Sequence, residues 1–233
     1  MYKGHTVSVV IPCYNEEDGI RVMLADMPAL VDEVIVVDNN CTDRTAEVAT
    51  EWGAKVVVET KPGYGAACKA GFSAASADII VAMDGDATYP RNFIPVILDV
   101  LIEEDLDFIS CDRTGHKAEE ANSFLRVLGN FILDLTIFAL FFVWLKDSQS
   151  GMWVFRRSIL LQFNLISERM SFSEEIKIEA FTRKGLRARE LPIYYKARLG
   201  ESKLKLWRDG FSNLFFLFKK RFSTWRNRPS PKA

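Results

Sequence analysis

Short apolar runs alternate with helical patterns along the first half of the chain. The runs VSVVI, VIVV and IIVAM are apolar at nearly every position, which is typical of strands that are covered on both faces. We predict strands at Val7–Ile11, Glu33–Val37, Lys55–Val58, Asp78–Met83 and Asp107–Cys111. Helical patterns lie between them, at Glu16–Leu30, from Thr42, at Ala66–Ala75 and from about Pro90 to Glu104. This alternation predicts an α/β fold with a mostly parallel, doubly wound sheet and helices on both of its faces.

The pattern changes after Arg113. Phe124–Leu145 is long, aromatic-rich and helical, and DSQSG (147–151) has the composition of a turn that leads into a strand. Phe172–Lys184 has the pattern of an amphipathic helix, and ARELPIYYKAR is strand-like. Because no linker separates these segments from the first half, we expect one domain, residues 1–203, followed by a basic aromatic tail, residues 204–233.

Composition and charge narrow the class of protein. The chain is 48% hydrophobic with a net charge of −1, so the whole molecule has no bias toward nucleic acid. The segment from Lys203 to Ala233, however, contains nine basic residues and only one acidic residue, Asp209. The four cysteines lack metal-site spacing and are expected to be reduced, and the chain begins almost directly on a strand. We therefore expect no signal peptide and a cytoplasmic location.

Polar residues follow three of the predicted strands. PCYNEE (12–17) follows the first strand, DNNCTD (38–43) the second and DGD (84–86) the fourth. Taken singly, the first two segments could be only a helix start and an Asx-rich turn. Together they lie at the carboxyl edge of one sheet, where open α/β sheets bind ligands. The position of all three segments at one edge of the sheet indicates a binding site.

The DGD segment is the sharpest of these signals. Asp84 and Asp86 project to the same side of an extended backbone, and Gly85 between them allows a ligand to approach closely. Paired carboxylate oxygens suit Mg²⁺ or Mn²⁺, which in turn can hold a diphosphate. A calcium loop is excluded, because Tyr89 and Pro95 occupy the positions that need glycine and glutamate. A purely structural turn is the alternative.

A glycine-rich segment with a cation, KPGYGAA (61–67), precedes the third predicted helix. Such a segment at a helix N-terminus can cradle a phosphate or a ribose. It does not match a dinucleotide fingerprint, because Cys68 occupies the position of the third glycine. Alone this segment is weak evidence.

Six segments together resemble a known family. IPCYNEE, VVDNNCTDRT, KPGYGAACKAGF, MDGDATYP, DSQSG and RLGESK are similar to the inverting GT-A glycosyltransferases of family 2. The resemblance is nearest to the branch of dolichol-phosphate mannose synthase and related polyprenyl-phosphate hexosyltransferases, and it runs from about Thr6 to Lys203. It implies transfer of a hexose from a UDP-sugar or GDP-mannose to a polyprenyl or dolichyl phosphate, with Mg²⁺ or Mn²⁺ as cofactor.

The resemblance also implies roles for individual residues. Nucleotide-sugar binding falls to Pro12, Tyr14, Glu16, Asp38, Lys61, Gly65, Asp84 and Gly85, and metal binding to Asp84 and Asp86. The acceptor phosphate would meet Arg113, Arg126, Ser150, Arg198, Ser202 and Lys203. The catalytic set would be Asp86, Arg113, Arg126, Asp147, Arg198 and Lys203. Thr88 stands where the mannose synthases often carry a glutamine beside the metal, so the third protein ligand is open.

The chemistry of a phosphate acceptor agrees with this set. A phosphate monoester is largely a dianion at neutral pH and attacks without a general base. A hydroxyl acceptor would need one, and Glu174 and Glu175 are the only obvious candidates; a solvated or structural role for both is the alternative. Two alternatives therefore stay open: a family 2 enzyme that glycosylates a hydroxyl of a soluble glycan, and a non-catalytic, membrane-associated nucleotide-sugar-binding module.

Two segments are candidates for contact with a membrane. Val127–Leu145 approaches spanning length, but Asn130 and Asp134 interrupt it, and a central Asp costs about 2.5–3.5 kcal/mol. We expect a core or an interfacial helix there. The tail interleaves aromatic residues with cations, which predicts an amphipathic helix on anionic lipid at the cytosolic face. The alternative is a helix that packs on the domain.

Overall fold

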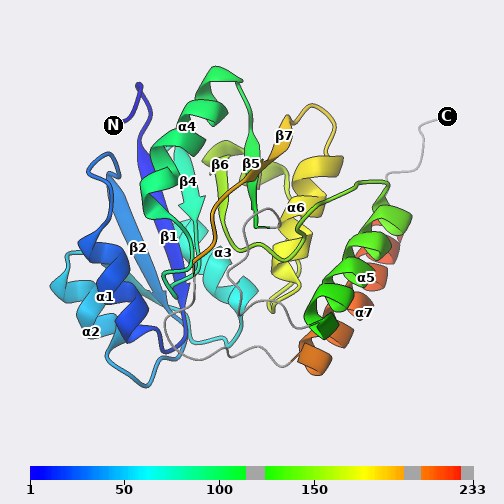
Figure 1. Ribbon diagram of the computed structural model, residues 1–233, viewed down its shortest axis with the longest axis horizontal. Helices are drawn as coiled ribbons and strands as arrows, with labels where there is room; N and C mark the ends of the chain where they lie inside the picture. The colour runs from blue at the N-terminus through cyan, green and yellow to red at the C-terminus, as the bar shows by residue number, and fades with distance from the viewer. Residues whose placement is uncertain (114–123, 197–205, 227–233) are drawn as a thin grey trace.

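The computed structural model describes residues 1–113, 124–196 and 206–226. Within these residues seven strands form one sheet, in the order β3-β2-β1-β4-β6-β5-β7 (Figure 1). Their bounds are β1 (Val7–Cys13), β2 (Glu33–Asp38), β3 (Lys55–Val58), β4 (Ile79–Ala82), β5 (Phe108–Asp112), β6 (Trp153–Arg156) and β7 (Ala188–Pro192). The predicted strands of the first half are all present.

The sheet is parallel except at one strand. β1 pairs in parallel with β2 and β4, β2 with β3, and β5 with β7. β6 lies between β4 and β5 and is antiparallel to both. The mostly parallel sheet is therefore confirmed. The segment after DSQSG returns through the middle of the sheet, and this places the turn beside the carboxyl end of β4.

Helices cover both faces of the sheet. On one face lie α1 (Glu17–Ala25), α2 (Thr45–Glu51) and α4 (Ile94–Glu103), which pack on the side chains of Val9 and Ile11 among others. On the other face lie α3 (Tyr64–Ala74) and α6 (Phe172–Thr182), which pack on Val10 and its neighbours. Consecutive residues of β1 thus point into two different cores, which explains the unbroken apolar run. Two short 3₁₀ helices, η1 (Arg91–Phe93) and η3 (Arg157–Gln162), complete the set.

The two remaining helices lie side by side at one flank of the molecule (Figure 1). They are α5 (Phe124–Phe141) and α7 (Leu206–Arg226). Leu133 and Ile137 of α5, Leu217 of α7 and Ile178 of α6 form a third, smaller core. α7, which forms most of the predicted tail, therefore packs against the domain through part of its surface.

Two helices of the first half begin or end inside their predicted bounds. α1 ends at Ala25, not Leu30, and Pro28 follows in the connection to β2. α2 begins at Thr45, not Thr42, because the carboxylate of Asp43 accepts hydrogen bonds from the amide and hydroxyl of Thr45 at 3.0 and 2.6 Å. Thr42 instead belongs to the loop that faces β1.

The prediction of an amphipathic helix at Phe172–Lys184 is wrong in one respect. The helix is present as α6, but every residue from Phe172 to Ala180 is buried. Its polar residues are buried too: Glu175 and Glu179 form ion pairs of 2.8 and 2.7 Å with Lys220 of α7. α6 therefore lies between the sheet and α7, and the charges of Glu175 and Glu179 are paired inside the protein.

Candidate active site

The loops after β1 and β2 are joined into one surface at the carboxyl edge of the sheet. The side-chain oxygen of Asn15 accepts a hydrogen bond of 2.7 Å from the amide of Thr42. The amide of Glu16 donates to the hydroxyl of Thr45 at 2.9 Å. Asn15 has a positive φ of 55°, so it makes the sharp turn from strand to helix. The predicted convergence of these two segments is confirmed by these contacts.

Asn39 holds the glycine-rich segment in place. Its amide nitrogen donates to the carbonyls of Glu59 and Lys61, both at 2.8 Å, and its oxygen accepts from the amide of Gly63 at 2.8 Å. Gly63 has a φ of 142°, which only glycine adopts readily. The neighbouring Asp38 caps its own turn by accepting a hydrogen bond of 2.7 Å from the amide of Cys41. Asn39 was not a predicted site residue, although it lies within the DNNCTD segment.

The DGD segment packs closely against two other segments. A Cβ on Gly19 would collide with the carbonyl oxygen of Gly85, and a Cβ on Gly151 would collide with the carboxylate of Asp84. The amide of Gly151 donates to the hydroxyl of Tyr89 at 2.6 Å. The start of α1 and the DSQSG turn are therefore in contact with the two sides of the segment that carries the paired carboxylates.

Each carboxylate of the pair is oriented by a hydroxyl. Tyr64 donates to Oδ1 of Asp84 at 2.9 Å. The amide and hydroxyl of Thr88 donate to Oδ1 of Asp86 at 3.1 and 2.6 Å. Thr88 is fully buried, and its hydroxyl proton is directed at Asp86. Thr88 thus orients a carboxylate.

The carboxylates of Asp84 and Asp86 fit a divalent cation whose other ligands come from the substrate and water. Among the described residues, no three His, Cys, Asp or Glu side chains are grouped to hold a metal. Asp84 and Asp86 supply hard carboxylate oxygens at one strand end. Mg²⁺ commonly binds to one or two carboxylates and completes its shell with substrate phosphates and water. The pair fits that pattern and does not fit a closed structural metal site.

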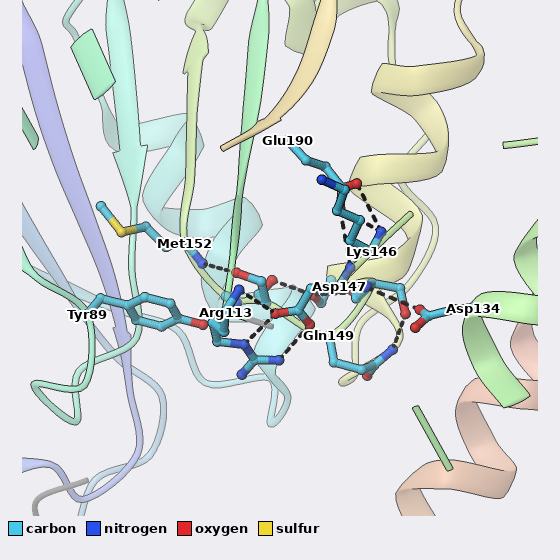
Figure 2. Close-up of polar contacts among 12 residues, drawn as sticks. Tyr89, Arg113, Asp134, Lys146, Asp147, Gln149, Met152 and Glu190 are labelled. Carbon is cyan, nitrogen blue, oxygen red and sulfur yellow. Dashed lines mark hydrogen bonds and ion pairs between the residues drawn. The ribbon is translucent and has the colours of Figure 1, made fainter. Parts of the chain in front are cut away.

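Arg113 and Asp147 form a two-point ion pair (Figure 2). Nε and Nη2 of Arg113 donate to the two oxygens of Asp147 at 2.7 and 2.8 Å. The guanidinium carbon also lies 5.2 Å from the ring centroid of Tyr195. Burial alone would raise the pKa of Asp147, but the guanidinium of Arg113 outweighs it and holds this pKa below its usual range. Asp147 is therefore a fixed anion that orients Arg113.

The DSQSG turn that carries Asp147 is enclosed by polar side chains from several elements. The amide of Ser148 donates to Asp134 of α5 at 3.3 Å, and the side-chain oxygen of Gln149 accepts from Asn213 of α7 at 3.3 Å. Glu190 of β7 accepts from the amide of Lys146 (Figure 2). α5 and α7 thus contact the candidate site through the same short turn.

Three predicted acceptor residues, Arg198, Ser202 and Lys203, lie outside the described residues, as does the side chain of Arg126. Ser150 is fully buried, and its hydroxyl oxygen accepts from the amide of Met152 at 3.4 Å. Its predicted contact with the acceptor phosphate stays a prediction, as do the roles assigned to the other site residues. Pro12 is buried, whereas Tyr14 and Lys61 are exposed at the edge of the sheet.

Neither candidate general base reaches solvent. Glu174 and Glu175 are both fully buried in α6. Glu175 accepts hydrogen bonds from the amides of Ile166 and Ser167 and pairs with Lys220. Burial raises the pKa of Glu174 to about 8, so this carboxyl is mostly protonated at neutral pH. Both side chains are enclosed by the protein and contact other parts of its interior.

A set of exposed apolar side chains lies on α5, on α7 and directly after α5. We call it the flank surface; its described members are Val127, Leu128, Phe131, Ile132, Leu135, Phe138, Phe142, Trp144, Phe211, Phe215, Phe218 and Phe222. Phe142 and Phe215 are 77% and 73% exposed. In the described part of the chain, no helix has the length and apolar character needed to cross a membrane. Large exposed apolar patches mark surfaces that meet a partner or a lipid.

Comparisons with known proteins show the family of the chain. The sequence profile of glycosyl transferase family 2 matches residues 8–163. A dolichyl-phosphate hexose transferase of Haloferax volcanii is 34% identical and aligns over 90% of this chain and 91% of its own length. A dolichol-phosphate mannosyltransferase of Pyrococcus furiosus is 30% identical and aligns over 85% of this chain and 59% of its own length.

Solved structures share the fold at lower identity. A mycobacterial protein superposes with a TM-score of 0.77 at 22% identity, over 94% of this chain and 75% of that one. Glucosyl-3-phosphoglycerate synthase of Mycobacterium tuberculosis, solved with Mn²⁺, uridine diphosphate and phosphoglyceric acid, superposes with a TM-score of 0.74 at 21% identity. That match covers 98% of this chain and 81% of the synthase.

Proposed function

The chain belongs to glycosyl transferase family 2, and from this premise we propose that it transfers a hexose from a nucleotide-diphosphate sugar to a polyprenyl or dolichyl phosphate. The GT-A fold and the resemblance to the dolichol-phosphate mannose synthase branch are confirmed. One observation carries the proposal. The turn that fixes Arg113 through Asp147 also packs Gly151 against the carboxylate of Asp84, so a cation and a carboxylate pair lie on either side of one short segment.

The carboxylate side is assigned to the donor. Asp84 and Asp86 would hold Mg²⁺ or Mn²⁺, which when bound neutralises charge on the departing diphosphate. Asp38, in the loop next to the glycine-rich segment, and Tyr14 and Glu16, after β1, would bind the nucleoside. Asn39 holds that segment close to the same edge, so the loop and the sheet edge form one continuous surface for the nucleotide-sugar.

The cation side is assigned to the acceptor phosphate. Asp147 engages two of the five N–H donors of Arg113, and we assign the others to phosphate oxygens of the acceptor. A phosphate dianion needs alignment and no proton removal. The burial of Glu174 and Glu175 supports this assignment over a hydroxyl acceptor, because the two obvious bases are enclosed in α6.

A membrane surface is assigned to α5 and α7. The acceptor carries a lipid tail, and the flank surface borders helices that contact the DSQSG turn through Asp134 and Asn213. Aromatic side chains at that flank can enter the interfacial layer of a bilayer. We place the protein as peripheral at the cytosolic face.

A donor screen tests the function directly. Purified full chain is incubated with UDP-glucose, UDP-galactose, UDP-N-acetylglucosamine or GDP-mannose, with Mg²⁺ or Mn²⁺, and with either a short-chain prenyl phosphate or a soluble glycan as the acceptor. We expect one donor to give a prenyl-phosphate hexose that is labile to mild acid. Transfer only to a soluble hydroxyl, or to none of the acceptors although the nucleotide binds, would contradict the proposal and would favour the two alternatives respectively.

A further inference from the structure

The turn that carries Asp147 encloses the side-chain ammonium of a lysine from another element. Lys177 of α6 is fully buried, and its ammonium donates to the main-chain carbonyls of Asp147, Ser148 and Ser150 at 3.0, 2.8 and 2.8 Å. An ammonium has three N–H donors, and the three carbonyls are its nearest partners; the hydroxyl of Ser173 lies farther away, at 3.3 Å. The carbonyls of one turn therefore point inward at a single cation.

Two neighbouring groups complete this arrangement. The hydroxyl of Ser173, one helical turn before Lys177, approaches the carbonyls of Ser148 and Ser150 at 3.2 and 2.8 Å. The indole nitrogen of Trp153 donates to the carbonyl of Ser150 at 2.9 Å. The path of the main chain through the turn is thus set by side chains that bind its carbonyls, while the Asp147 carboxylate binds Arg113.

The buried charge is costly. Burial lowers the pKa of Lys177 to about 8, with Asp147 opposing that shift and Arg113 adding to it. Other charged or titratable groups that face this region are Glu174 on α6, Asp134 on α5 and Glu190 on β7. An apolar side chain in its place would leave the carbonyls of the turn without this donor, so the path of the turn depends on the ammonium.

We propose that Lys177 is a positioning residue for the acceptor pocket: its ammonium fixes the 147–150 main chain so that the carboxylate of Asp147 meets Arg113 along two bonds. The inference rests on the proposed function for its kinetic consequence, but the geometric claim about Arg113 stands apart from it. Lys177 does not touch the substrate in this scheme. It acts through Asp147, and Asp147 acts through Arg113.

The test compares Lys177→Met with two other variants of the full chain. Methionine keeps the length of the side chain and removes the N–H donors. We expect the KM for a water-soluble, short-chain prenyl phosphate to rise at least tenfold, while the KM for the nucleotide-sugar stays within twofold. Ser173→Ala, which removes the second donor to the same carbonyls, should raise the acceptor KM two- to fivefold.

Lys220→Met is the matched control. Lys220 is equally buried and pairs with Glu175 and Glu179 away from the turn, so its loss should lower the melting temperature and leave the acceptor KM within twofold. An acceptor KM that follows the melting temperature across the variants would overturn the proposal. So would equal rises in both KM values. If Lys177→Met does not fold, an unchanged acceptor KM in Ser173→Ala overturns it.

A spectroscopic readout separates this inference from the proposed function. The Nε–H resonance of Arg113, assigned by its loss in Arg113→Lys, reports the hydrogen bond to Asp147. We expect it to shift and exchange faster in Lys177→Met and to stay in place in Lys220→Met. A wild-type chain that transfers to no prenyl phosphate would refute the function, and this resonance would still decide the role of Lys177: an unchanged signal in Lys177→Met refutes it.

Discussion

Arg113 and Asp147 are joined by three hydrogen bonds, two from the guanidinium at 2.7 and 2.8 Å and one from the main-chain amide of Arg113 at 3.1 Å. The pair connects the end of β5 to the turn before β6, two neighbouring strands that run in opposite directions. Their loops therefore meet at one end of the sheet. The orientation of the guanidinium is set by the fold before any ligand arrives, which is the condition for alignment of an anionic acceptor.

Asp147→Asn should disable the acceptor side and leave the donor side intact. The asparagine side chain has the volume of the aspartate, but only its oxygen can accept a hydrogen bond. The positive charge of Arg113 also loses its counter-ion. We expect kcat/KM for the prenyl phosphate to fall about 100-fold, or about 3 kcal/mol, with nucleotide affinity unchanged by calorimetry. Asp105→Asn, which alters an exposed ion pair with Arg156 and Arg187, is the control and should be active. Loss of nucleotide binding in Asp147→Asn would show that the two sides are misassigned.

Asp86→Asn should remove transfer while the fold survives. Asp86 is buried, and Thr88 orients its carboxylate, so asparagine fits the same space but offers a cation one weak oxygen. We expect a loss of activity of at least about 100-fold, from loss of several kcal/mol of charge stabilisation. Excess EDTA should have the same effect on the wild type, and added Mg²⁺ or Mn²⁺ should reverse it. Full activity in EDTA would refute the metal assignment.

Glu174 should make stability fall as pH rises. Burial raises its pKa to about 8 from an ordinary value of 4.5, against the lowering effects of Gln149 and Lys177. Between those values the folded state holds a proton that the unfolded state has released, so the free energy of unfolding decreases with pH by about 1 kcal/mol per unit. Urea titrations at pH 5.5 and 8.0 measure this change.

Glu174→Gln is the matched variant for that experiment, because glutamine resembles the protonated acid. Its free energy of unfolding should depend less on pH than that of the wild type, and the variant should be the more stable of the two at pH 8.0. The window stops at pH 8 because the lowered pKa of Lys177 acts with the opposite sign above it. Parallel pH profiles for the two proteins would show that Glu174 is ionised in the folded state.

The sheet, and the gathering of polar loops at its edge, could be predicted because both follow from local signals. Unbroken apolar runs such as VSVVI indicate strands buried on both faces, and DGD follows one of them directly. The insertion of β6 between β4 and β5 could not be predicted. An antiparallel strand that returns through a sheet is specified by tertiary packing of Trp153 and Phe155, and a short apolar segment carries no sign of its neighbours.

The buried polar groups under the DSQSG turn were also missed. Glu174 and Lys177 have the spacing of solvated helix positions, so the pattern of α6 predicted an amphipathic helix. Lys220 of α7, which is buried away from that turn, was missed for the same reason. Their burial depends on partners that lie far away in the sequence, at Ser150 and Glu175 for example. Pairing across such distances leaves no periodic signal. The only local signal was the density of charges in FSEEIKIE beside the apolar residues of a predicted helix.

Phe211 and Phe215 should anchor the protein to lipid without supporting its fold. Both lie on the exposed side of α7, whereas Leu217 and Lys220 on the other side are fully buried. Lys220 is therefore not available to a membrane, because this cation of the predicted basic tail is buried in the protein. Deleting the whole helix would expose α6, so point variants are the sharper test.

Phe211→Ser with Phe215→Ser should weaken binding to vesicles of phosphatidylcholine with phosphatidylserine. Each buried Phe contributes about 1.5–3 kcal/mol, so we expect at least a tenfold loss in the partition coefficient by sedimentation, with the melting temperature within about 2 °C of the wild type. Added salt should release part of the wild type, since exposed cations such as Lys219 each contribute about 1 kcal/mol near an anionic leaflet. Asp209→Asn is a control on the same helix and should bind at least as well. Equal sedimentation of the double variant and the wild type would move the membrane contact to the α5 half of the flank surface, where Phe138→Ser and Phe142→Ser would be examined in the same way.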